Sequence, residues 1–205
     1  MIIRSLFPEP VYFSELERKL TRQELKTINE YKKKTCKNTG NTTTTNNYVL
    51  EHKALKNLKE DLDKKIIDYF DKVVCTNNSI IPYITQSWIN YTKKGAYHHK
   101  HSHPNSYVSG IFYINAKKGV DRIKFYNSHY QNILPITLDV TKFNIFNASA
   151  WWYPVKTGDI ILFPSSLEHA VERKKGTNTR ISLSFNVFIK GKFGNNSKLT
   201  ELVLK

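Results

Sequence analysis

The sequence predicts a mostly β protein, a β-sandwich or jelly-roll barrel preceded by helices. From residue 80 onward, short runs rich in β-branched and aromatic residues alternate with turn residues at close spacing, which is typical of such folds. Twelve Tyr, eleven Phe and three Trp favour a sheet-rich interior. The 205 residues fit one domain, in which residues 1–79 form an N-terminal helical extension that packs on the barrel and residues 80–205 form the core.

The N-terminal part predicts helices and one polar tract. Capping-box patterns at residues 14–17 and 21–24 each predict the start of a short helix. The small polar residues of 37–47 predict a mobile loop. A longer helix is expected over residues 51–74, because apolar residues recur there at steps of three and four and would pack on the back of a sheet. This stripe consists of Leu55, Leu58, Leu62, Ile66, Tyr69 and Val73.

Eight strands are predicted in the remainder of the chain. Each is a short β-forming run, and glycines fall at or near the boundaries, where turns or bulges are expected. The predicted strands cover residues 83–91, 107–116, 122–126, 136–142, 150–155, 159–163, 169–172 and 180–189.

Charge and cysteine content limit the partners and the compartment. The net charge is +15, from 32 Lys and Arg against 17 Asp and Glu, and such a balance attracts acidic partners such as an acidic protein or a nucleic acid. The lysines are spread along the sequence rather than gathered in one segment. Two cysteines do not form a disulfide framework, and neither a signal peptide nor an apolar run of membrane-spanning length is present, so a cytoplasmic protein is expected.

Three histidines form a candidate metal site. His101 and His103 are two positions apart in a segment that leads into a strand, and alternate side chains of an extended chain share a face. His169 follows another apolar strand and supplies a third nitrogen. Three neutral donors around an open position suit a catalytic transition metal. The other histidines are expected to lie outside the site: His52, His98, His99 and His129.

Arg180 begins a strand in which polar and apolar residues alternate. Ser182 has the same parity as Arg180, so both side chains are expected to face the barrel interior. An arginine in an apolar interior needs an anion. A carboxylate bound in a bidentate manner, with a further hydrogen bond from Ser182, would satisfy it.

Four segments together resemble the Fe(II)- and 2-oxoglutarate-dependent oxygenases, in particular a group found in bacteria and their viruses. The segments are Trp88-Ile-Asn90, His101 to Tyr113 with its His-x-His-Pro start, Gly158 to His169, and Arg180 to Asn186. The resemblance covers residues 80–190 and implies a double-stranded β-helix, a cupin-like jelly roll, with the metal at one end and 2-oxoglutarate deeper in the barrel.

The activity and the ligands are likewise implied by this resemblance. The implied activity is hydroxylation of an unidentified substrate, with Fe(II) as the cofactor and 2-oxoglutarate and O2 as co-substrates. Succinate and CO2 would be released. His101, His103 and His169 would be the catalytic metal ligands. Arg180 and Ser182 would bind 2-oxoglutarate, with help from Tyr113 or Asn90. Trp88 and Asn186 would line the pocket.

One position departs from the common family pattern. Most members have a carboxylate where this chain has His103. Either His103 coordinates as a third nitrogen, or it lies behind the ligands while a carboxylate such as Asp121 completes the triad, or the site holds another metal. The two-residue spacing from His101 favours the first alternative.

Two other functions fit parts of the sequence. A cupin-like three-histidine dioxygenase would use the same histidines without 2-oxoglutarate, although Arg180 and Ser182 then have no role. A non-enzymatic jelly-roll module would use the +15 charge to hold a polyanion. Homodimerisation through the N-terminal helices is a further expectation.

Overall fold

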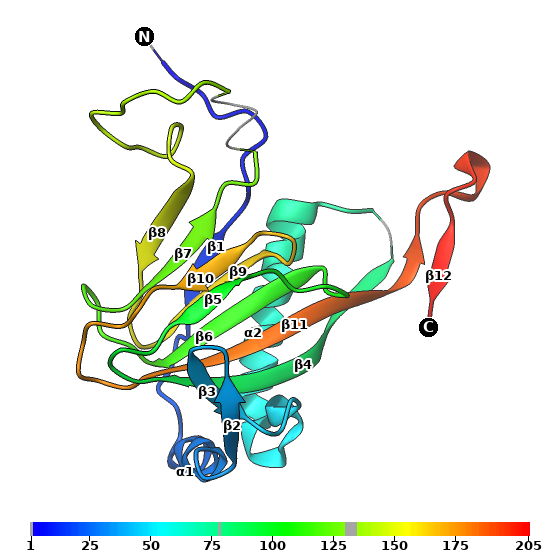
Figure 1. The fold of residues 1–205 in the computed structure, drawn as a ribbon. Coiled ribbons are helices and arrows are strands. Elements are labelled where there is room, and N and C mark those ends of the chain that lie inside the picture. Colours follow the sequence, from blue (N-terminus) through cyan, green and yellow to red (C-terminus); the bar gives the residue numbers. More distant parts are fainter. Residues whose placement is uncertain (1, 78, 130–134) are drawn as a thin grey trace.

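The protein consists of two antiparallel sheets with helices on the outer face of the larger one (Figure 1). The computed structural model describes residues 2–77, 79–129 and 135–205. In the large sheet the strand order is β1-β9-β6-β11-β4-β3-β2, and β12 pairs with β11; in the small sheet it is β5-β10-β7-β8. This arrangement is the predicted jelly-roll core with N-terminal helices.

The large sheet contains β1 (Tyr12–Glu15), β2 (Thr35–Asn38), β3 (Asn41–Thr44), β4 (Ile80–Thr92), β6 (Val108–Asn115), β9 (Asp159–Pro164), β11 (Arg180–Phe193) and β12 (Leu202–Leu204). The small sheet contains β5 (His98–His101), β7 (Arg122–Tyr126), β8 (Ala150–Pro154) and β10 (His169–Val171). The helices are α1 (Arg22–Tyr31) and α2 (Lys56–Tyr69), with 3-10 turns at Val49–Glu51, Lys53–Leu55 and Asn196–Lys198 and a π-helical turn at Phe70–Val74.

Alternation along the strands divides the apolar residues between two cores. On β6, Phe112 and Ile114 pack against the helices, whereas Ile111 and Tyr113 face the small sheet. We call the cluster between the two sheets the inner core and the cluster under the helices the outer core; the inner core also includes Ile123 of β7. The polar face of β11 forms one wall of the space between the sheets. The period of two thus decides which side chains can reach a site between the sheets.

The helical predictions are confirmed in part. Thr21 and Glu24 form the expected capping box of α1, but the pattern at residues 14–17 does not start a helix, because β1 pairs there with β9. Most of the stripe predicted over residues 51–74 is buried in the outer core, yet Val73 is 38% exposed where the chain turns out of α2. α2 itself begins only at Lys56, after two 3-10 turns.

Two loop and strand predictions are wrong. The tract 37–47 is not a mobile loop, since β2 and β3 form a hairpin and β3 pairs with the edge of β4 through Thr42 and Tyr91. Gly40 makes its turn with a φ of +86°, a conformation that glycine adopts without strain. Residues 136–142 form no strand and are mostly exposed, so this β-forming run has no partner strand.

Residues 1–79 contribute strands as well as helices. β1 extends one side of the large sheet and β2–β3 the other, so the sheet continues across the boundary drawn at residue 79. The division into an extension and a core stays a prediction. Neither α1 nor α2, nor any shorter helix in the described chain, has the length and apolar character needed to cross a membrane.

Candidate metal and anion site

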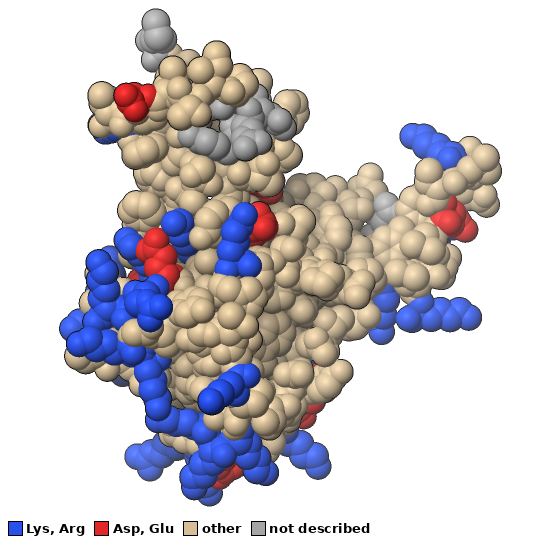
Figure 2. Space-filling view, viewed as in Figure 1, with Lys and Arg blue, Asp and Glu red and all other residues tan. Residues whose placement is uncertain are grey.

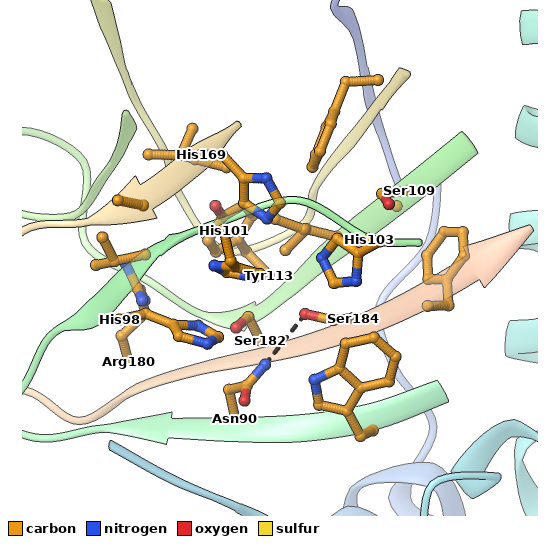
Figure 3. Close-up of a pocket in the computed structure, with 18 residues that line it drawn as sticks. Asn90, His98, His101, His103, Ser109, Tyr113, His169, Arg180, Ser182 and Ser184 are labelled. Atoms are coloured by element: carbon orange, nitrogen blue, oxygen red, sulfur yellow. Dashed lines mark hydrogen bonds between the residues drawn. The ribbon is translucent and has the colours of Figure 1, made fainter. Parts of the chain in front are cut away.

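A pocket between the two sheets contains most of the predicted site residues. Its floor is formed by β4, β6 and β11 of the large sheet, and its other wall by β5 and β10 (Figure 3). The predicted residues that line it are Asn90, His101, His103, Tyr113, His169, Arg180 and Ser182, and Trp88 lines it as well. Asn186, the other lining residue expected from the sequence, is not among them.

His101, His103 and His169 lie together as predicted. His101 ends β5 and His169 begins β10, where they are directly opposite one another, and His103 follows in the loop after β5. One ring nitrogen from each of the three lies within 4.8 Å of those of the other two. Such a group of atoms has the spacing of a three-nitrogen metal site.

Backbone carbonyls orient two of these rings. Nδ1 of His101 lies 2.8 Å from the carbonyl oxygen of His99, and Nδ1 of His169 lies 3.1 Å from that of Leu167. A carbonyl only accepts, so in each ring Nδ1 carries the hydrogen and donates it. The lone pair is therefore on Nε2, and a backbone partner behind the ring is the usual support of a metal-binding histidine.

Burial keeps the three imidazoles neutral. It lowers the pKa of His169 to about 3 and that of His103 to about 4, and the neighbouring His101 ring adds to both shifts. The pKa of His101 is lowered by burial as well. Neutral rings offer the lone pairs that a metal ion requires, so the donor set fits a transition metal.

Asp121 is held in another network. Its carboxylate accepts bonds from Nζ of Lys174 at 2.6 Å, from the Asn178 amide at 3.0 Å and from the backbone N–H of Lys117 at 2.8 Å. Burial opposes ionisation, but these bonds lower the pKa of Asp121 overall. Asp121 does not line the pocket, and the groups of potential metal ligands among the described residues contain only histidines. The alternative in which Asp121 completes the triad does not fit this geometry.

Arg180 is a buried cation without a counter-ion in the described part of the protein. Its side chain donates to the hydroxyl of Thr92 at 3.2 Å and to the carbonyl oxygen of Arg122 at 3.4 Å, while its Nε has no partner. The residue is only 3% exposed, and burial lowers its pKa. Because a buried guanidinium with free donors is costly, an anion in the pocket would stabilise it. This confirms the inward orientation expected from the alternation on β11.

Three polar residues form a row beside Arg180. Ser182 on β11 is paired with Asn90 on β4 and with Tyr113 on β6, and cross-strand partners point to the same face. The Asn90 amide donates to Ser184 at 3.1 Å, and its buried oxygen has no partner in the part of the chain that the structure describes. Burial raises the pKa of Tyr113 to about 12, so its hydroxyl stays a hydrogen-bond donor.

His98 was expected outside the site but lines the pocket. Its ring stacks on that of His101, with 4.4 Å between centroids. In a regular strand, residues three apart point to opposite faces, but the register between β5 and β10 shifts here, because His101 pairs with His169 and His98 with Val171. This β-bulge brings His98 and His101 to one face. No sequence signal marks the bulge, since β5 consists of the four polar residues His-His-Lys-His.

Exposed cations gather at the end of the barrel where Arg180 begins β11. They come from the loops after β4, β6 and β10, and Figure 2 shows Lys and Arg side chains concentrated over these loops, on the left of the molecule. We call them the basic loops; their residues are Lys93, Lys94, Lys117, Lys118, Arg173 and Lys175. Across the described ranges, no salt bridge involves any of the six, although neighbouring Lys174 is paired with Asp121. The fold thus collects lysines that the sequence spreads over more than eighty positions.

Comparisons with known proteins identify a matching family and a shared fold. A family model described as "Putative 2OG-Fe(II) oxygenase" matches residues 86–186, which include every residue proposed above for the metal and the anion. No curated protein sequence matches the chain.

Several solved structures have a similar fold at low sequence identity. HygX from Streptomyces hygroscopicus, crystallised with nickel and 2-oxoglutarate, aligns with a TM-score of 0.57 and 11% identity, covering 87% of this chain and 82% of that one. An oxidoreductase of the 2OG-Fe(II) oxygenase family from Burkholderia pseudomallei gives 0.56 and 12%, covering 86% and 83%. A prolyl hydroxylase from Trichoplax adhaerens, in complex with a peptide of hypoxia inducible factor, gives 0.58 and 15%, covering 87% and 83%. At these identities the likeness concerns the fold.

Proposed function

Because residues 86–186 form a domain of the 2OG-Fe(II) oxygenase family, we propose that this protein is an Fe(II)- and 2-oxoglutarate-dependent oxygenase that hydroxylates its substrate. The observation that carries the proposal is the juxtaposition, in one pocket, of three neutral imidazoles with a buried arginine that has no counter-ion among the described residues. The first group suits a metal and the second a carboxylate, and the co-substrate of this family binds to both.

His101, His103 and His169 are the proposed iron ligands. Three neutral ligands leave the metal with its full positive charge, whereas the usual triad contributes one carboxylate. This charge favours an anionic co-substrate electrostatically. The carbonyl partners of His101 and His169 hold their rings in the tautomer that binds metal.

Arg180 and Ser182 are the proposed partners of the distal carboxylate of 2-oxoglutarate. The guanidinium has donors left over after its bonds to Thr92 and Arg122, and a carboxylate can accept two of them. Tyr113 and Asn90 flank Ser182 and can add hydrogen bonds from either side. Their position on three adjacent strands holds them rigidly, which favours a defined orientation of the ligand.

When bound, iron supplies oxygen activation, with O2, 2-oxoglutarate and a C–H bond giving succinate, CO2 and an alcohol. The protein's own contribution is to orient the ligands and to exclude water from the reacting centre. Hydroxylation is the outcome we propose among those open to such a site. One structure of similar fold is an α-ketoglutarate dependent epimerase, SnoN, at 9% identity and a TM-score of 0.60.

The cupin-like three-histidine dioxygenase is the competing function. It would use His101, His103 and His169 equally well, but it leaves Arg180 buried without an anion. Anaerobic addition of Fe(II) and then 2-oxoglutarate discriminates between the two. We expect a charge-transfer absorption band that needs both components and disappears in Arg180→Ala. Demonstrated metal binding without any response to 2-oxoglutarate would favour the competitor.

The proposed compartment and partners follow from charge and cysteine chemistry. Cys36 and Cys75 are both free, in keeping with a reducing compartment, and we propose the cytoplasm of a bacterium or of a cell infected by its virus. The basic loops favour an acidic substrate or partner, protein or nucleic acid. The non-enzymatic polyanion-binding module and the homodimer through the N-terminal helices stay predictions.

A further inference from the structure

His98 occupies the pocket at a position that the metal site does not require. Its ring lies on the Arg180 side of His101, and Figure 3 shows it between the Arg180 and Ser182 side chains in that view. The Arg180 side chain lines the same pocket and lies on this side of the histidine cluster (Figure 3). A polar ring is therefore placed beside the guanidinium rather than among the apolar residues of the inner core.

The hairpin β2–β3 supports this ring from outside the barrel. The Asn38 side-chain amide lies 3.5 Å from Nε2 of His98, and the backbone N–H of Tyr97 donates to the carbonyl oxygen of Gly40 at 3.0 Å. A Cβ on Gly40 would approach the Tyr97 ring to 2.8 Å, so the hairpin turn sits directly against the start of β5. The turn that the sequence predicts to be mobile thus forms part of the support of the pocket wall.

The pocket also contains a free hydrogen-bond donor. Arg180, which lines the same pocket as His98, has an Nε without a partner among the described residues. If Asn38 donates to Nε2, the hydrogen of the neutral His98 ring is on Nδ1 and is available to an acceptor. A carboxylate held by Arg180 provides such an acceptor.

We propose that His98 is a further binding residue for the carboxylate of 2-oxoglutarate, and that Asn38 of the β2–β3 hairpin is its positioning residue. This inference rests on the proposed function. It assigns the N-terminal hairpin a part in co-substrate binding, since removal of Asn38 would free the His98 ring to turn. It also distinguishes His98 from its exposed neighbour His99.

The test measures two affinities on the intact protein by calorimetry, those of Ni(II) and, for the nickel-loaded protein, of 2-oxoglutarate. Nickel is used because it binds without activating oxygen. We expect His98→Ala to raise the dissociation constant of 2-oxoglutarate by roughly tenfold or more, as for loss of a hydrogen bond to a charged group, with the nickel affinity unchanged. His98→Gln, which keeps a side-chain donor, should recover part of the loss. Asn38→Ala should weaken 2-oxoglutarate binding by a smaller factor, and His99→Ala should leave both affinities unchanged.

Three results would overturn the inference. If His98→Ala binds 2-oxoglutarate as tightly as the wild type while Arg180→Ala does not, His98 has no such role although the proposed function stands. If His98→Ala and His99→Ala both weaken nickel binding, the cluster His98, His99 and His101 holds the metal instead. If the nickel-loaded wild type does not bind 2-oxoglutarate, the proposed function itself fails.

Discussion

His101 and His169 are directly opposed residues of β5 and β10, and the centroids of their rings lie 4.4 Å apart. The two candidate ligands closest to one another thus come from different strands, 68 positions apart in the sequence and joined by the pairing of the small sheet. A metal held by both would link the two strands, so its binding should be coupled to the stability of this sheet.

Metal binding should stabilise the protein, and loss of His169 should abolish the effect. A ligand at a hundred times its dissociation constant stabilises the native state by about 2.7 kcal/mol. We expect the melting temperature of the metal-free protein to rise on addition of Ni(II) or Fe(II), and His169→Ala to show no rise at the same metal concentration. His129→Ala is the matched control, because His129 is exposed. A rise that persists in His169→Ala would place the metal elsewhere.

Replacement of Arg180 should weaken 2-oxoglutarate binding and leave metal binding intact. Loss of one partner of a buried charge pair costs about 2 kcal/mol or more, which is roughly a 30-fold loss of affinity. Arg180→Lys keeps the charge but not the planar fork, so an intermediate affinity is expected. Calorimetric titration of the nickel-loaded variants measures this. Equal affinities for wild type and Arg180→Ala would mean that the carboxylate binds away from β11.

Replacement of His103 decides whether it is a ligand. Replacement of a residue that only supports a ligand lowers metal affinity by roughly 10–100-fold. If His103 is itself the third ligand, His103→Ala should lower the Ni(II) affinity by more than that. His103→Asp restores the common family pattern and should keep metal binding, while its negative charge should weaken binding of the 2-oxoglutarate dianion. Unchanged metal affinity in His103→Ala would put His103 behind the ligands.

The metal-free protein should lose stability as the pH falls below about 6.5. Burial lowers the pKa values of His98 and His169 to about 3 and that of His103 to about 4, so the unfolded chain binds more protons than the native state in between. Their contribution is complete above the unfolded pKa and is lost progressively as the pH falls toward these folded values. Each such proton changes the free energy of unfolding by at most about 1.4 kcal/mol per pH unit.

Denaturant unfolding between pH 7.5 and 4.5 measures this dependence. Carboxylates with lowered pKa, such as Asp121, contribute in the lower part of the same range. The informative comparison is therefore with His103→Asn, which should show a shallower slope between pH 6.5 and 4.5 than the wild type. Identical slopes would mean that His103 is as accessible to protons in the native state as in the unfolded chain.

The basic loops should dominate binding of polyanions. We expect charge reversal at Lys93, Lys94, Lys117 and Lys118 to weaken binding of a single-stranded oligonucleotide and to reduce the slope of log K against log salt. The control carries the same number of reversals in or beside α1, at Arg22, Lys26, Lys32 and Lys33. An equal loss in both variants would mean that the net charge of +15 acts as a whole rather than through these loops.

Much of the barrel follows from the sequence, because strand alternation is a local property. The predicted strands at residues 122–126, 159–163 and 180–189 coincide closely with β7, β9 and the first part of β11. Their period of two also places Arg180 and Ser182 on the inner face, since successive side chains of a strand point to opposite sides. The spacing of His101 and His103 is a local feature of the same kind.

Other features depend on contacts between distant segments. The tract 37–47 becomes a hairpin only because the edge of β4 offers it a partner, while residues 136–142 have similar β-forming character and find none. His98 enters the pocket through a bulge against β10, which no pattern within β5 reveals. Asp121 is held away from the histidines because Lys174, 53 residues further along the chain, binds its carboxylate.

The sequence by itself therefore determined the fold class, the inward face of the strand that begins at Arg180, and the residues of the candidate metal and carboxylate site. Tertiary structure alone decided which of seven histidines meet, which carboxylate is excluded, and where scattered lysines gather. The physical reason is that side-chain direction follows from backbone periodicity, whereas proximity follows from the pairing register of strands distant in the chain.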